Sequence, residues 1–170
     1  MTPDRDASVA GHVAAADVAA VLRARDETLA TAESLTGGAL ASALVEVPGV
    51  SAVYRGGVVP YATPLKHELL GVDADLLARE GAVHPEVARQ MADGVRARLA
   101  TTWGVATTGV AGPDPQDGKA PGTVHVAVSG PSGVLVRTFA LPGDRSAVRR
   151  ASVAAALDLL AEALRVQPWA

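Results

Sequence analysis

The stretch Thr31-Ala-Glu-Ser-Leu-Thr-Gly-Gly38 places hydroxyl groups, a carboxylate and two adjacent glycines between two apolar segments. Residues 27–31 predict a short buried strand, and residues 39–47, which lack glycine and proline, predict a helix. Glycines at a strand-to-helix turn allow the backbone to approach a ligand, and the first N–H groups of a helix point beyond the turn. A serine at position 34 would then face a partial positive charge, which suits an alkoxide or an oxyanion.

The same pattern has a simpler interpretation. Ser34 could be an ordinary N-cap of the helix, and Gly37 and Gly38 could be ordinary turn residues. Because N-caps are far commoner than nucleophiles, this stretch assigns no chemistry unless the rest of the chain supplies a base and a binding site.

A serine nucleophile needs a base, and Lys66 is the strongest candidate in the sequence. It follows Tyr61 where a strand is expected to pass into a helix. Burial at such a joint lowers the pKa of a lysine because desolvation disfavours the charged form, and serine–lysine pairs are a known variant of the catalytic triad. Tyr61 could relay the proton or orient the lysine. The alternative is a half-buried tyrosine beside a solvated lysine.

The histidines are weaker candidates for the base, although histidine is the commonest choice in enzymes. His12 lies in a polar N-terminal segment, and His67 is expected to point to solvent. His84 fits a helix start, and His125 lies inside an alternating strand, where a structural or surface role is expected. None of them has an acidic partner in a recognisable motif.

Two further polar segments are expected near Ser34. The loop Thr108–Asp114 follows a predicted strand and opens a connection through Gly122 that is long for a compact domain, which favours a functional role. Ligands of open α/β sheets bind beyond the carboxyl ends of the strands, so this loop, Lys66 and the Ser34 turn are expected to share a site. Arg145, at the start of the last helix, could hold an anion there, or could instead pair with Asp144 on the surface.

The pattern of elements predicts an α/β fold, a three-layer α/β/α sandwich with a mixed, mostly parallel sheet and a late β-hairpin. Helices separate the early strands, and a turn at 130–133 joins the last two. We expect one domain over residues 1–170, with residues 1–12 flexible. The strands are expected at 27–31, 56–61, 103–108, 123–129 and 134–141, and the helices at 17–25, 39–47, 63–70, 73–80, 84–99 and 143–164.

Composition excludes several classes of protein. Hydrophobic residues make up 49% and charged residues 19% of the 170 residues, which is typical of a globular chain. The lack of cysteine excludes disulfides and thiolate metal sites, and no histidine lies in a ligand motif, so neither a metal nor a cofactor is expected. The net charge of -3 gives no sign of nucleic-acid binding. Without an apolar run of about 18 residues or a signal peptide, we expect no membrane association and a cytoplasmic location.

Several segments, in this order along the chain, resemble the CinA C-terminal domain, the nicotinamide-nucleotide amidohydrolase (PncC) family. The resemblance extends from about Val18 to Leu164, and it is the order of the motifs that makes it specific. The segments are 32–38, 57–66, 70–72, 108–114, 121–124 and 143–150.

This resemblance implies hydrolysis of the carboxamide of nicotinamide mononucleotide to nicotinate mononucleotide and ammonia, without a metal. It implies Ser34 as the nucleophile, with Tyr61 and Lys66 assisting, in a stand-alone, homo-oligomeric form of the domain. Backbone N–H groups near Thr36 and Gly37 are expected to hold the oxyanion. The residues expected to contact the substrate are Glu33, Thr36, Gly37, Gly38, Thr108, Gly109, Ala111, Gly112, Asp114 and Arg145.

The chain also departs from the family pattern. Ala62 and Thr63 stand where the family often has Ser-Asn, and His84 stands where it often has serine. These departures bear on substrate fit more than on mechanism. Two other functions stay open: a nucleotide-binding regulatory module without turnover, and hydrolysis of a different small amide by the same residues. Ammonia release from nicotinamide mononucleotide discriminates among them.

Overall fold

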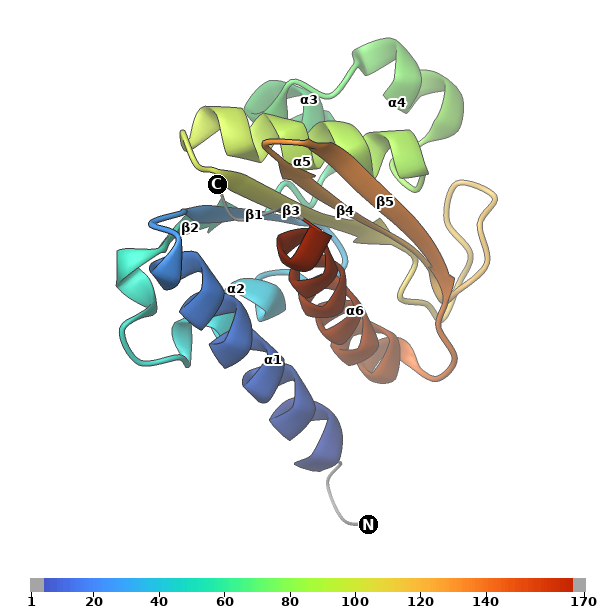
Figure 1. Cartoon of the computed structure of the whole chain (residues 1–170). Coiled ribbons are helices and arrows are strands. Elements are labelled where there is room, and N and C mark those ends of the chain that lie inside the picture. The colour runs from blue at the N-terminus through green and yellow to red at the C-terminus, as the bar shows by residue number, and fades with distance from the viewer. Residues whose placement is uncertain (1–4, 167–170) are drawn as a thin grey trace.

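The computed structural model describes residues 5–166 and contains helices on both faces of one sheet (Figure 1). The helices are α1 (Arg5–Ala24), α2 (Ala39–Val45), α3 (Thr63–Leu70), α4 (Ala74–Glu80), α5 (Pro85–Arg98) and α6 (Arg145–Val166), with a 3-10 turn at Val50–Ala52. The strands are β1 (Leu29–Glu33), β2 (Tyr54–Val58), β3 (Trp103–Gly109), β4 (Thr123–Gly130) and β5 (Gly133–Ala140).

The sheet has the strand order β2-β1-β3-β4-β5, and it is mixed as predicted. Strand β1 runs parallel to β2 and β3, whereas β4 runs antiparallel to β3 and β5. Four of the five strands run in the same direction, as predicted for a mostly parallel sheet, although two of the four strand pairs are antiparallel. The connection from β3 to β4 contains no helix, so the chain turns back beside β3 instead of crossing over.

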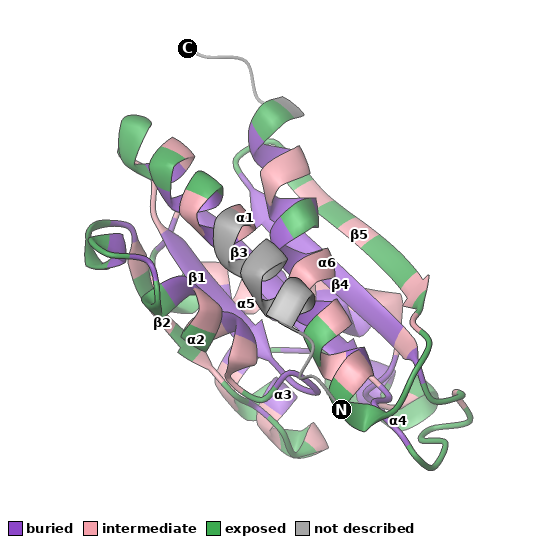
Figure 2. Cartoon of the chain, turned by 90° about the horizontal axis from the view of Figure 1, so that it is seen from below, coloured by how far each residue is buried: buried purple, intermediate pink, exposed green. Residues whose placement is uncertain are grey.

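Each face of the sheet has its own apolar core. Valines of β3 and β4 pack against α1, α2 and α6, while small residues of β1, β3 and β4 pack against α5. At Gly104 a β-carbon would collide with the backbone of Ala92, so the glycine lets α5 approach the sheet closely. Figure 2 shows β1, β3 and β4 buried between these layers and β5 partly exposed at the edge. None of the described helices is long and apolar enough to cross a membrane.

The N-terminal helix is longer than predicted. Helix α1 begins at Arg5, so Asp17 lies within it instead of capping it. Alanine has the highest helix propensity, and the alanine-rich run around residues 14–20 extends the helix upstream of the periodic valines and leucine used to predict it. Residues 1–4 lie outside the described residues.

The other boundaries follow the local sequence closely. Helices α3, α4 and α5 lie where they were predicted, and Asp73 caps α4 by accepting the N–H groups of Asp75 and Leu76. Strand β1 begins two residues later than predicted and includes Glu33. Strand β2 ends at Val58, ahead of Pro60, which has no N–H to contribute to the sheet.

Candidate functional site

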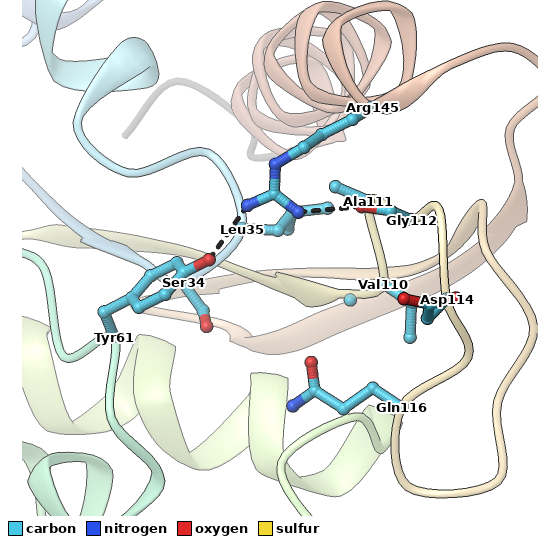
Figure 3. A pocket seen from close by; sticks show the side chains of 10 residues that line it. Ser34, Leu35, Tyr61, Val110, Ala111, Gly112, Asp114, Gln116 and Arg145 are labelled. Carbon is cyan, nitrogen blue, oxygen red and sulfur yellow. Dashed lines mark hydrogen bonds between the residues drawn. The ribbon is translucent and has the colours of Figure 1, made fainter.

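A pocket opens where β1 and β3 end side by side, because Glu33 of β1 pairs with Thr107 of β3 (Figure 3). Its walls come from the turn after β1, the segment after β2, the loop after β3 and the start of α6. Including its open mouth, the pocket contains about 470 Å³ of empty space. The lining residues are Ser34, Leu35, Tyr61, Gly109, Val110, Ala111, Gly112, Asp114, Gln116 and Arg145.

Ser34 is not at the start of α2, which corrects the predicted geometry. The helix begins at Ala39, after Gly37 and Gly38 have taken left-handed conformations with φ of 58° and 96°. Gly38 is the N-cap and contributes no side chain, so the alternative that Ser34 is an N-cap is also wrong. The two glycines lengthen the turn and separate the serine from the helix.

Glu33 caps α2 in place of the serine. Its carboxylate is buried and accepts the N–H groups of Gly38, Leu40 and Ala41 at 3.0, 3.0 and 2.8 Å. An anion in this position satisfies backbone donors that have no partner inside the helix. The carboxylate is therefore engaged by the protein and does not line the pocket, although it was predicted to contact substrate.

Replacing Glu33 by glutamine is expected to lower the free energy of unfolding by about 2–3 kcal/mol. The amide keeps one acceptor oxygen but turns an NH₂ group toward backbone N–H donors, which leaves some of them unpaired. Urea denaturation of the wild type and the variant measures the difference. Glu46→Gln, at an exposed position just after α2, is the control and should change stability by less than about 0.5 kcal/mol. A loss for Glu33→Gln no larger than the control's would contradict the capping role.

The Ser34 turn is also attached to β3. The N–H of Ser34 donates to the carbonyl of Thr107 at 3.0 Å, and the buried hydroxyls of Thr36 and Thr107 form a hydrogen bond of 2.7 Å. The N–H of Gly37 was predicted to hold the oxyanion, but it donates to the carbonyl of Ser34 at 3.1 Å and is therefore engaged within the turn. Among the described residues, the N–H groups of Leu35 and Thr36 have no acceptor, and of these two residues only Leu35 lines the pocket.

Lys66 is fully buried, so the alternative of a solvated lysine is wrong. Its Nζ donates to the carbonyls of Pro60 and Tyr61 at 2.8 and 3.3 Å, beneath the segment that carries Tyr61 to the pocket. Burial lowers the pKa of Lys66 to about 8, partly opposed by the carboxylate of Asp117. This direction agrees with the prediction, but Lys66 does not line the pocket and makes no hydrogen bond to Ser34 in the described structure.

Tyr61 and Arg145 meet at the mouth of the pocket. Tyr61 is 58% exposed, and its hydroxyl accepts a hydrogen bond from Nη2 of Arg145 at 3.0 Å. Nη1 of Arg145 donates to the carbonyl of Gly112 at 2.9 Å, so the guanidinium connects two walls of the pocket. Asp144 does not pair with this arginine; its carboxylate instead caps α6 through the N–H of Ala147.

Some predicted site residues lie outside the pocket lining. The hydroxyl of Thr108 donates to the carbonyl of Ala82 at 2.7 Å and is buried beneath the loop. The predicted residues that do not line the pocket are Glu33, Thr36, Gly37, Gly38, Lys66 and Thr108. Three lining residues were not predicted individually: Leu35, Val110 and Gln116. Val110 and Gln116 nevertheless lie in the long connection after β3 that was predicted to be functional.

The described histidines have structural partners. Nδ1 of His67 contacts the carbonyl of Val72. His84 is the N-cap of α5, and its Nδ1 accepts the N–H of Glu86. His125 contacts the hydroxyl of Thr138, and none of the three lines the pocket. The side chain of His12 lies outside the described residues. Within the part of the chain that the structure describes, no group of three or more histidine, aspartate or glutamate side chains is placed to hold a metal ion.

Known proteins with the same architecture share this arrangement of elements. The sequence pattern of the CinA C-terminal domain family matches residues 12–164 of this chain. A CinA-like protein of Frankia casuarinae is 53% identical over 151 residues, which are 89% of this chain and 35% of that protein. The competence/damage inducible protein CihA of Agrobacterium tumefaciens has a TM-score of 0.87 at 36% identity, covering 92% of this chain and 96% of that one. A CinA superfamily protein of Klebsiella pneumoniae has a TM-score of 0.89 at 34% identity, covering 92% and 99%. The chain spans about a third of the length of the curated relatives it matches.

Proposed function

The chain belongs to the CinA C-terminal domain family, and on that premise we propose that it hydrolyses the carboxamide of nicotinamide mononucleotide to nicotinate mononucleotide and ammonia. The observation that carries the proposal is the convergence of Ser34, Tyr61 and Arg145 on one pocket, from three segments far apart in the sequence. A hydroxyl can act as the nucleophile, a phenol can relay a proton and a cation can bind an anionic substrate, so together these groups suit an amidase.

In the proposed reaction, Oγ of Ser34 attacks the amide carbon and its proton passes to the neutral amine of Lys66. With a pKa of about 8, roughly one molecule in ten has this lysine neutral at pH 7. The hydrogen bond from Lys66 to the carbonyl of Tyr61 puts the amine next to the segment that carries the phenol, which supports a relay through Tyr61 or a water. Ammonia leaves with a proton returned from this relay, and water then hydrolyses the acyl-serine ester.

Two polar side chains of the pocket could bind the ribose and the phosphate of the nucleotide. Asp114, on the loop after β3, is a candidate acceptor for the ribose hydroxyls. Arg145 is the candidate for the phosphate, because its guanidinium is already at the pocket and matches a phosphate with two parallel donors. To bind the phosphate, Arg145 would exchange its hydrogen bonds to Tyr61 and Gly112 for charged acceptors.

The direct test is release of ammonia from nicotinamide mononucleotide by the purified chain. Turnover would support the proposal. Binding of the nucleotide without turnover would favour the rival function, a nucleotide-binding regulatory module. If ammonia is released from another small amide but not from this nucleotide, the machinery is retained and the substrate assignment is wrong.

Arg145→Ala is expected to lower kcat/KM for nicotinamide mononucleotide by roughly ten- to a hundredfold, because a charge-assisted hydrogen bond contributes about 1.5–3 kcal/mol. Nicotinamide riboside has no phosphate, so its kcat/KM should change much less. Steady-state kinetics of both substrates with wild type and variant measure the difference. Equal losses for the two substrates would assign Arg145 a structural role, through its contacts to Tyr61 and Gly112.

A further inference from the structure

Arg149 grips the Ser34 turn from α6, although it does not line the pocket. Its Nε donates to the carbonyl of Leu35 at 2.9 Å and its Nη2 donates to the carbonyl of Thr36 at 2.8 Å. The guanidinium therefore holds two consecutive peptide groups just after the serine, across 113 or more residues of sequence. Nothing in the proposed reaction uses this residue directly.

Because peptide groups are planar, holding these carbonyls also fixes the directions of the N–H groups in the turn. In a trans peptide the carbonyl and the following N–H point in opposite directions. With the Thr36 carbonyl held by Arg149, the N–H of Gly37 points away from the guanidinium, where it donates to the carbonyl of Ser34 at 3.1 Å. With the Ser34 carbonyl held in turn, the N–H of Leu35 points the opposite way. Leu35 lines the pocket, and this N–H has no acceptor within residues 5–166.

The turn needs such a restraint because of its glycines. Gly37 and Gly38 both have positive φ, and glycine populates other backbone conformations at little cost, so the neighbouring peptide groups can rotate. The start of α2 supplies one restraint, since the N–H of Ala39 donates to the Thr36 carbonyl at 3.1 Å. The Leu35 carbonyl accepts from Arg149, which also passes close to Gly37: a β-carbon there would lie 3.5 Å from Nη2.

We propose that Arg149 is a positioning residue, which fixes the peptide groups of the Ser34 turn so that the N–H of Leu35 is presented to the oxyanion. The inference rests on the proposed function in one respect, that Ser34 is the nucleophile. Backbone donors that are held in place before the reaction stabilise the developing charge without reorganisation during it. Arg149 thus acts on the transition state through the backbone, not by contact with the substrate.

Arg149→Met is expected to lower kcat for nicotinamide mononucleotide by about a hundredfold, the effect of losing one oxyanion donor, with KM changed less than about threefold. Arg149→Lys should recover part of the loss, since an ammonium can hold one of the two carbonyls but not both. Arg137→Met is the matched control: this arginine donates to Glu162 of α6 and lies away from the pocket. Its kcat should stay within about twofold of wild type.

Two binding measurements separate positioning from a general structural role. In a Ser34→Ala background, Arg149→Met should leave the affinity for nicotinamide mononucleotide within about twofold. With Ser34 intact, 3-pyridylboronic acid, whose boron accepts Oγ of Ser34 to form a tetrahedral adduct that mimics the intermediate, should bind at least about tenfold more weakly to Arg149→Met. If both affinities fall together, or if neither changes while kcat is unaffected, the positioning role is wrong.

The boronate also separates this inference from the substrate assignment. If the wild type releases no ammonia from nicotinamide mononucleotide but forms the boronate adduct at Ser34, and Arg149→Met weakens that adduct, the proposed substrate is wrong and the positioning role stands. If the folded wild type forms no adduct and shows no turnover, Ser34 is not a nucleophile and the inference is overturned with it.

Discussion

Ser34→Ala is expected to lower ammonia release from nicotinamide mononucleotide by at least about a thousandfold, since removal of a serine nucleophile can cost as much as removal of its whole catalytic set. The protein should keep its fold and its affinity for the nucleotide. The turn is held by the backbone N–H of Ser34, which donates to the carbonyl of Thr107, and this bond does not depend on the side chain. Steady-state turnover, thermal unfolding and nucleotide binding measure the three effects.

Ser42→Ala provides the matched control for this experiment. Ser42 lies on the exposed side of α2, so its loss should leave turnover and stability unchanged. If Ser34→Ala keeps more than about 5% of wild-type kcat, the nucleophile lies elsewhere and the proposed attack by Ser34 on the amide is wrong. A loss of activity that comes with a large fall in the unfolding temperature would instead assign Ser34 a role in the turn.

Much of the fold could be predicted because many of its boundaries are set by local chemistry. Asp73 begins α4, Gly71 ends α3 in a left-handed conformation, and Pro85 lies at the start of α5 after His84. Each of these signals acts within one helical turn and is legible in a single sequence. The direction of β4 relative to β3 was harder to predict, because it depends on whether the long connection between these two strands contains a helix.

The site was predicted in outline for a similar reason. Ser34, Tyr61, Asp114 and Arg145 follow strands or begin a helix, and those ends of the parallel strands meet at one edge of the sheet. The roles of their neighbours depend on where each side chain points. Glu33 is adjacent to the serine in sequence, yet its side chain points to the start of α2 and not into the pocket. The two glycines place the first N–H groups of the helix within reach of its carboxylate.

Long-range hydrogen bonds set the limit of prediction from this sequence. Arg149 follows Arg145 by one turn of α6, and both were visible as arginines in one motif. That one reaches the pocket while the other holds the backbone of the Ser34 turn depends on how α6 packs beside α2. A hydrophobic pattern can predict that α6 is a helix with a buried side, but not which carbonyls lie beside its arginines.

Substitution of Lys66 should lower kcat/KM by about 10²- to 10⁴-fold, the usual contribution of a general base. Lys66→Ala removes the base. Lys66→Arg keeps a donor for the carbonyls of Pro60 and Tyr61 but cannot give up its proton in a protein, so it should fail as badly as alanine. Lys119→Arg, which changes the other lysine of the chain, is the control and should leave kcat/KM unchanged.

The pH profile separates a base from a residue that only supports the Tyr61 segment. A base must be neutral to accept the proton, and burial lowers the pKa of Lys66 to about 8. Below that pH the lysine is protonated, so wild-type kcat/KM should fall tenfold for each pH unit, and above it the rate should reach a plateau. If Lys66 only holds the two carbonyls, Lys66→Arg should recover much of the activity, and the profile should show no transition near pH 8. An active Lys66→Arg enzyme with the wild-type profile would therefore exclude Lys66 as the base and leave the proton of Ser34 to another group.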